Sequence, residues 1–194
     1  MPSMVIHKLQ LPNNMENKKI ILQRNVQAHL IPSGDKVTLK KGEPISIIQA
    51  LGGSYTILMN GNLFKLDNED ADAIGKKVIT SERIDNKKNG GKVKEDQIWD
   101  QLRTVYDPEI PINIVDLGLI YDCKIRNGEN GTIVNIKMTL TAPGCGMGPV
   151  ITSEAKRKIE GIPGVREVNI DLVWEPLWNR DMMSEAALLQ LGIL

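Results

Sequence analysis

A single thiol surrounded by glycines is the feature of this sequence that points most directly to chemistry. Cys145 lies between Gly144 and Gly146 in a segment that runs from Thr139 to Pro149. Glycine admits unusual backbone angles, so the amide N–H groups of such a loop can converge on a small anion. A cysteine just ahead of a helix N-terminus is in a setting that favours the thiolate, which can bind metal or attack an electrophile. The residues leave a second interpretation open, a tight glycine turn that holds an inert cysteine.

The second cysteine, Cys123, has a different setting. It shares the apolar face of a predicted strand with Leu119, Tyr121 and Ile125, so we expect it to pack as a small hydrophobic residue. Two cysteines are too few for a disulfide framework and suit a reducing cytoplasm. Both histidines lie in the other half of the sequence, so no local Cys–His pair is indicated.

Three acidic residues, Asp107, Glu109 and Asp116, occupy the predicted loop between the first helix and the first strand of the C-terminal half. Acids of this kind suit ordinary turn and capping positions. The functional alternative is that Asp116 reaches the cysteine loop and holds it by hydrogen bonds. The sequence does not choose between the two.

A connector with two tryptophans leads to the C-terminus. Trp178 and Arg180 either help to cover the sheet or form a partner surface, where Trp and Arg are enriched. Asp181 is expected to cap a last short helix that ends near Gly192.

The C-terminal half must position these residues, and its periodicity predicts the order helix, strand, strand, helix, strand. The expected helices cover 95–106 and 150–160, with Pro149 as the first helical residue of the second. The expected strands cover 119–126, 134–140 and 168–172, with a hairpin loop over 127–131. The last strand should lie parallel to a neighbour, which gives a compact sandwich.

The preceding part is rich in short predicted strands. Their ranges are 28–31, 37–39, 44–49, 55–59 and 63–66, and Asn60-Gly61 is a strong hairpin signal. An acidic cluster from Asp67 to Asp72 is expected to begin a helix. The sequence therefore predicts an α+β protein with four parts, a tail over 1–19, a small β-rich domain over 20–80, a linker over 81–94 and the sandwich domain over 95–194.

Charge and hydropathy exclude several classes. The net charge is zero, and the lysines of the basic N-terminal half are scattered with few aromatic residues between them, so nucleic acid is not an expected partner. No apolar run approaches the ~20 residues needed to cross a bilayer, so a membrane is not expected either. We expect a cytoplasmic protein.

Three motifs resemble the signatures of the metal–sulfur cluster assembly domain of SufT and PaaD-like proteins. They are Asp107-Pro-Glu-Ile, Asp116-Leu-Gly-Leu-Ile and Thr139-x-Thr-x-Pro-Gly-Cys145. The tail from Arg180 and the β-rich part with Gln49-Ala-Leu-Gly-Gly-Ser-Tyr resemble the longer SufT branch, so the resemblance spans roughly 26–194.

The resemblance implies an accessory factor in iron–sulfur cluster assembly rather than an enzyme, with Cys145 as its functional thiol. The supporting loop positions are Asp107, Glu109, Asp116, Thr139, Thr141, Gly144 and Gly146. Implied partners are iron–sulfur assembly proteins, client apoproteins and a second copy of the chain.

Stoichiometry limits the mechanism, because iron–sulfur clusters usually take four protein thiolates and this site offers one. Cys145 could hold iron or a labile cluster transiently, with other ligands completing the shell, or contact a client or carrier without holding a cluster. A cluster-free adaptor and a thiol-dependent enzyme are the alternative functions.

Overall fold

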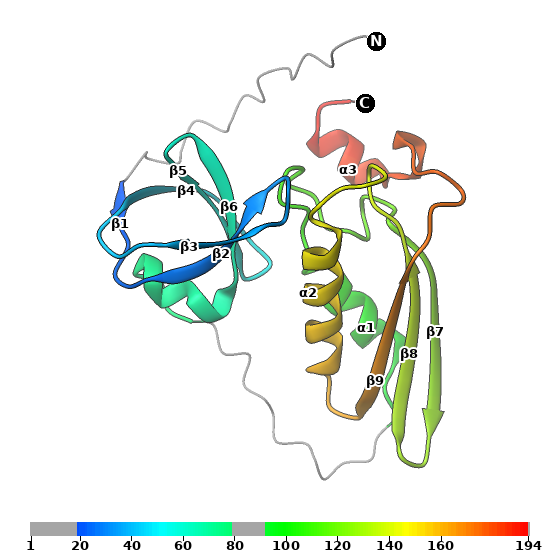
Figure 1. Ribbon diagram of the computed structural model, residues 1–194. Coiled ribbons are helices and arrows are strands. Elements are labelled where there is room, and N and C mark those ends of the chain that lie inside the picture. The colour runs from blue at the N-terminus through cyan, green and yellow to red at the C-terminus, as the bar shows by residue number, and fades with distance from the viewer. Residues whose placement is uncertain (1–18, 79–91, 194) are drawn as a thin grey trace.

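A computed structural model describes residues 19–78 and 92–193 and shows two β-sheets with helix α2 between them (Figure 1). The predicted α+β class is confirmed. The predicted tail over 1–19 and the predicted linker over 81–94 lie outside the described residues except for Lys19 and residues 92–94, of which Val93 is buried in the C-terminal core. None of the helices within the described ranges is long and apolar enough to span a membrane.

The N-terminal sheet is antiparallel, with the strand order β1-β4-β5-β6-β2-β3. Its strands are β1 (Ile20–Ile21), β2 (Val26–Ile31), β3 (Lys36–Leu39), β4 (Pro44–Leu51), β5 (Ser54–Met59) and β6 (Asn62–Leu66). All five predicted strands are present. The sequence analysis missed β1, which is only two residues long.

Two local predictions for this part are confirmed. Asn60 and Gly61 both have positive φ angles, 49° and 80°, as the expected tight β5–β6 hairpin requires. The acidic cluster begins a helix, a 3-10 helix, η1 (Asn68–Ile74), whose buried alanines and Ile74 pack into the core of the sheet. We call the part from Ile20 to Ile74 the β unit.

The C-terminal part has the predicted order of elements. They are α1 (Glu95–Leu102), β7 (Ile120–Gly128), β8 (Gly131–Met138), α2 (Gly148–Glu160), β9 (Val165–Leu172), η2 (Arg180–Met182) and α3 (Glu185–Gln190). β7 and β8 form an antiparallel hairpin, and β9 pairs parallel with β8, as expected. Figure 1 shows α1 and α2 on the side of this sheet that faces the β unit.

Helix α1 is shorter than predicted and ends at Leu102 instead of Tyr106. Val105 is fully buried, so its helical spacing marks the core correctly. The backbone there pairs with the following loop instead, because Tyr106 bridges to Asn113 and the N–H of Ile114 donates to the carbonyl oxygen of Val105. Tertiary pairing overrides the local helical pattern.

Three other boundaries also differ. The β7–β8 strands continue to Gly128 and Gly131, so the hairpin loop is tighter than the predicted 127–131, and the Thr132 hydroxyl donates to Asn127 across it. Helix α2 begins at Gly148, one residue before Pro149. Asp181 caps no helix, because Asn179 caps η2 and Ser184 caps α3.

A buried ion pair joins the β unit to the C-terminal part. Lys65 on β6 and Glu154 on α2 are each 3% exposed, and Lys65 Nζ lies 2.5 Å from Glu154 Oε2. The other carboxylate oxygen of Glu154 lies 3.2 Å from Lys158 Nζ. Glu154 is therefore a buried carboxylate held between two ammonium groups from two parts of the chain.

Lys158 extends this junction to the end of α1. Its ammonium group donates to the carbonyl oxygens of Gly52 and Thr104 at 2.6 and 2.7 Å and to the Thr104 hydroxyl at 2.9 Å. Ile31 of the β unit is buried in the C-terminal core, and Leu63 packs against the same core. The contact thus combines a small apolar area with charged and backbone polar groups.

Replacing Glu154 by glutamine is expected to destabilise the protein strongly. Lys65 would be left buried without its charged partner, and breaking a buried pair in this way costs about 3 kcal/mol or more. Lys65→Met should cost less, because Glu154 keeps Lys158. Urea unfolding of the three proteins measures the difference.

The matched control is Glu160→Gln on the same helix. Glu160 pairs with Lys156 at 3.8 Å on the exposed side of α2, and such pairs contribute about 0.5 kcal/mol or less. An equal loss of stability in the Glu154 and Glu160 variants would show that the buried pair does not join the two parts.

The buried ring nitrogens of His29 lead us to expect that the stability of the protein depends on pH. Neither ring nitrogen has a hydrogen-bond partner among the described residues, and burial lowers the pKa of His29, with Asp67 opposing and Lys36 and Lys65 adding to the effect. The unfolded chain therefore binds the proton more readily. The contribution of neutral His29 to the free energy of unfolding should be fully present above the ordinary pKa of 6.5 and should be lost as the pH drops below it.

The measurement is the urea midpoint at about pH 7.5 and about pH 5.5 for the wild type and His29→Leu. The variant should lose less stability on acidification than the wild type. Parallel losses in both proteins would assign the acid sensitivity to other groups.

Candidate functional site

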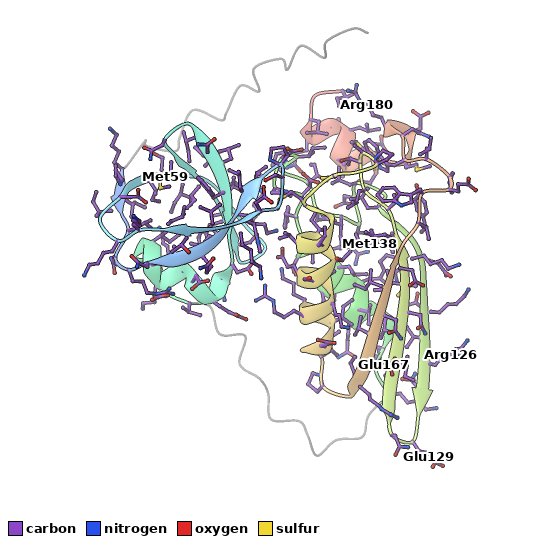
Figure 2. The ribbon with its side chains drawn as sticks, viewed as in Figure 1. Met59, Arg126, Glu129, Met138, Glu167 and Arg180 are labelled. Carbon is purple, nitrogen blue, oxygen red and sulfur yellow. The ribbon has the colours of Figure 1, made fainter. Side chains whose placement is uncertain are left out.

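Cys145 lies in the loop between β8 and α2, over 139–147, which we call the Cys145 loop. Val173 N–H donates to the Met138 carbonyl oxygen and Thr139 N–H donates to that of Leu119, so the start of the loop is fixed to both neighbouring strands. Figure 2 shows Met138 well away from Glu129, which lies at the tip of the β7–β8 hairpin. The loop therefore occupies the end of the sheet opposite that tip.

The Cys145 loop uses its backbone groups internally. The Cys145 N–H donates to the Ala142 carbonyl oxygen at 3.3 Å, and the Cys145 carbonyl oxygen accepts from Gly148 N–H at 3.1 Å. Two amides that the sequence suggested for binding an anion are therefore engaged in the turn. This loop is a compact turn that leads into α2.

Exposure divides the loop into two sides. Residues 142–144 are exposed, Cys145 and Gly146 are half-buried, and Met147 is buried. Cys145 also packs against the C-terminal hydrophobic core. Cys145 thus lies at the edge of the core, next to the exposed residues 142–144 of the loop.

The two glycines beside Cys145 serve different purposes. Gly144 has a φ angle of 77°, a conformation that favours glycine, and a Cβ there would meet nothing within 4 Å. A Cβ on Gly146 would overlap the carbonyl oxygen of Ser33. The β unit therefore lies directly against the loop, through the turn between β2 and β3.

Cys123 is half-buried, as Cys145 is, but it lies on a strand rather than in a loop. It is on β7, packs against the core as predicted, and burial, with the charges of Glu95 and Asp122, raises the pKa of its thiol to about 11. At neutral pH this cysteine stays protonated, so it is a weak nucleophile and a poor metal ligand.

The acidic candidates organise the loop before β7. Asp107 is buried, and its Oδ1 accepts from the N–H groups of Glu109 and Ile110, each at 2.8 Å. Burial nevertheless raises the pKa of Asp107, with these hydrogen bonds and Lys65 opposing the effect. Glu109 is exposed. Asp107 therefore fits the first of the two interpretations, that of an ordinary turn and capping residue.

Asp116 makes none of the expected hydrogen bonds to the Cys145 loop among the described residues. Its carboxylate accepts from Asn113 Nδ2 at 2.6 Å, and Asn113 Oδ1 in turn accepts from the N–H groups of Val115 and Asp116. Its carbonyl oxygen accepts from Ser184 N–H at 2.8 Å. Asp116 thus fixes its own turn and the C-terminal segment.

Trp178 covers the core, which was one of its two predicted roles. It is half-buried, packs against the C-terminal cluster, and its Nε1 donates to the Leu117 carbonyl oxygen at 2.7 Å. Arg180 is exposed on η2, and Figure 2 shows it at the end of the sheet opposite Glu129. The connector instead exposes Leu177 and Trp174, at 64% and 38%.

Thr139 is buried and Thr141 is half-buried at the start of the Cys145 loop. Among residues 19–78 and 92–193, no three His, Cys, Asp or Glu side chains are grouped closely enough to hold a metal ion. A metal centre at Cys145 would need further ligands from outside these residues.

The sequence analysis missed the residues that bring the β unit to the loop, which are Ser33, Gly34, Lys65, Glu154 and Lys158. One signal was available. Glu154 and Lys158 share the face of α2 that carries Ile151, Ala155 and Ile159, and charged residues on an apolar face are seldom buried without partners. Nothing in the sequence identified the partners.

Comparison with known proteins identifies the family to which the C-terminal half is similar. Residues 95–172 match the family described as iron–sulfur cluster assembly protein. A Fe-S protein maturation auxiliary factor of Porphyromonas gingivalis is 52% identical over 100 residues, which are 52% of this chain and 92% of that protein. The auxiliary factor SufT of Staphylococcus aureus is 42% identical over 89 residues, 46% of this chain and 98% of that protein.

A more distant relative and a solved structure match the same extent of chain or less. An iron–sulfur cluster carrier protein of Synechocystis is 30% identical over 80 residues, 41% of this chain and 22% of that protein. A crystal structure of a domain of unknown function, DUF59, from Bacillus anthracis is 38% identical, covers 52% of this chain and 92% of that chain, and has a TM-score of 0.46.

The family match does not reach the β unit, so the resemblance expected from residue 26 onward extends beyond the matched residues. Over the C-terminal half the agreement is close and covers nearly the whole of the two auxiliary factors. The chain belongs to the iron–sulfur cluster assembly protein family, as a member of its SufT group of Fe-S protein maturation auxiliary factors.

Proposed function

We propose that this chain is an accessory factor that helps to mature iron–sulfur proteins through the thiol of Cys145, without catalytic turnover of its own. The observation that carries the proposal is the contrast between the two cysteines. Cys145 lies in a loop beside the exposed residues 142–144, whereas Cys123 lies on a strand where burial raises the pKa of its thiol to about 11. In this proposal Cys145 is the thiol that meets partner proteins.

The cluster is cargo in this proposal. A single thiolate with no grouped His, Cys, Asp or Glu ligands around it in the described residues cannot complete the usual shell of four. The remaining ligands would come from a client apoprotein, an assembly protein, a small thiol or a second copy of the chain. Incomplete ligation favours release, which suits transfer rather than storage.

The two parts of the chain divide the work in this proposal. The domain over 95–194 carries Cys145 and contacts the assembly proteins and clients, while the domain over 20–80 acts on that thiol through the contact described above. Two free cysteines and no disulfide suit a reducing cytoplasm, which is where we place the protein.

Cys145→Ser is expected to abolish the function in cells. Cells that lack the protein are complemented with the wild type, Cys145→Ser or Cys123→Ser at equal abundance, and the activity of an iron–sulfur dehydratase is measured. Wild type and Cys123→Ser should restore the activity, whereas Cys145→Ser should leave it at the level of the empty vector. The serine keeps the size of the side chain but cannot supply a thiolate.

Equal restoration by the two serine variants would contradict a role for the thiol and favour the cluster-free adaptor. In that case the exposed connector is the surface to test, with Leu177→Ser and Trp174→Ser expected to fail. A covalent substrate adduct on Cys145, seen in the intact mass, would instead favour a thiol-dependent enzyme.

A further inference from the structure

The β unit reaches the Cys145 loop by a contact between two backbones. A Cβ on Gly34, in the β2–β3 turn, would overlap the carbonyl oxygen of Gly146, and a Cβ on Gly146 would overlap that of Ser33. Each position is thus a glycine because a side chain there would clash with the backbone of the other segment. The residue next to Cys145 is in van der Waals contact with a turn that lies more than a hundred residues earlier in the sequence.

The same pattern recurs at the other end of α2. A Cβ on Gly52, in the β4–β5 turn, would overlap the carbonyl oxygen of Thr104, and Lys158 donates to both backbones. Arg157 adds an ion pair with Glu69 at 2.8 Å. With Lys65 and Glu154 between these two ends, the β unit holds α2 along its length.

The chemistry of this contact suits reversible docking. Ile31 and Leu63 contribute apolar contacts, and ion pairs and backbone groups contribute polar ones. Contacts between domains of one chain are commonly polar in this way and permit relative motion. The β unit also has a hydrophobic core of its own, from Leu22 to Ile74, so it need not unfold to leave α2.

The relatives indicate that the C-terminal half also occurs without a β unit of this size. The two auxiliary factors are covered over 92% and 98% of their length by matches of 100 and 89 residues, so little of either chain remains to build a unit of this size. In this chain the face beside Cys145 is occupied by its own β unit.

We propose that the β unit is a built-in cover for the Cys145 loop. Docked on α2, its β2–β3 turn denies large partners access to the Cys145 thiol, and undocking of the β unit opens the face to a client protein. The ligand of the opened face is a protein surface, because the contact that the β unit would leave extends along α2 from Gly146 to Lys158. This inference concerns access to the thiol and does not depend on whether Cys145 handles clusters.

The test compares two thiol reagents on the full-length chain, with modification of Cys145 located by mass spectrometry of a digest so that Cys123 does not contribute. Iodoacetamide is small, and a maleimide on a long polyethylene glycol is bulky. For each protein the rate with the bulky reagent is divided by the rate with iodoacetamide. In the wild type this ratio should be at least about tenfold below the ratio measured for free glutathione.

Gly146→Ala should raise the ratio at Cys145 by about tenfold, since overpacking a close contact shifts an equilibrium by that order. The control is Gly144→Ala on the same loop, where the φ angle of 77° strains an alanine but its Cβ meets nothing within 4 Å; because strain without a clash does not push the β unit away, the ratio should stay within about twofold of the wild type. Far-UV circular dichroism checks that each variant is folded.

A second pair of variants tests the contact from the other side. Gly34→Ala and Gly42→Ala replace glycines with similar φ angles of 77° and 90° in turns of the β unit, but only Gly34 touches the loop. Gly34→Ala should raise the ratio and Gly42→Ala should not. Equal ratios for wild-type Cys145 and glutathione, or no difference within either pair of folded variants, would overturn the proposal.

Discussion

The arrangement of this protein depends on one buried carboxylate. Glu154 projects from α2 at 3% exposure, where an unpaired charge would be costly, and it is compensated by Lys65 of the β unit and Lys158 of its own helix. Since Lys158 also donates to Gly52 and Thr104, the same ammonium group connects α2 to the β unit and to the end of α1. The position of α2 determines where the Cys145 loop ends.

The glycines of the Cys145 loop are therefore required for two different reasons, a backbone conformation at one position and a close contact at the other. Gly144 accommodates a positive φ angle in the turn, whereas Gly146 allows Ser33 to approach. A glycine-rich loop beside a thiol invites the interpretation of an anion cradle, but the amides of Cys145 and Gly148 already donate within the turn. The glycine pattern reports a close approach between two parts of the chain.

The elements of this fold could be predicted from the sequence, because alternation and helical spacing are local properties. The Asn60-Gly61 hairpin and the parallel pairing of β9 with β8 follow from such patterns. The end of α1 could not, since its last predicted turn is replaced by pairing between Tyr106 and Asn113. Asp116 illustrates the same limit for the site, because the sequence left open whether it serves its own turn or the Cys145 loop, and its side-chain partner is Asn113, three residues away.

The contact between the two parts was beyond prediction for a related reason. A buried ion pair across 89 positions of sequence leaves no periodic signal, and a glycine that avoids a clash looks like one that turns the chain. The cost of burying Glu154 nevertheless has a functional logic. An apolar interface of the same size would hold the β unit more firmly, whereas charged groups are readily solvated again when they separate. In the proposed role the Cys145 thiol must be kept from unsuitable partners yet be released to the right one, and a polar, separable cover meets both requirements.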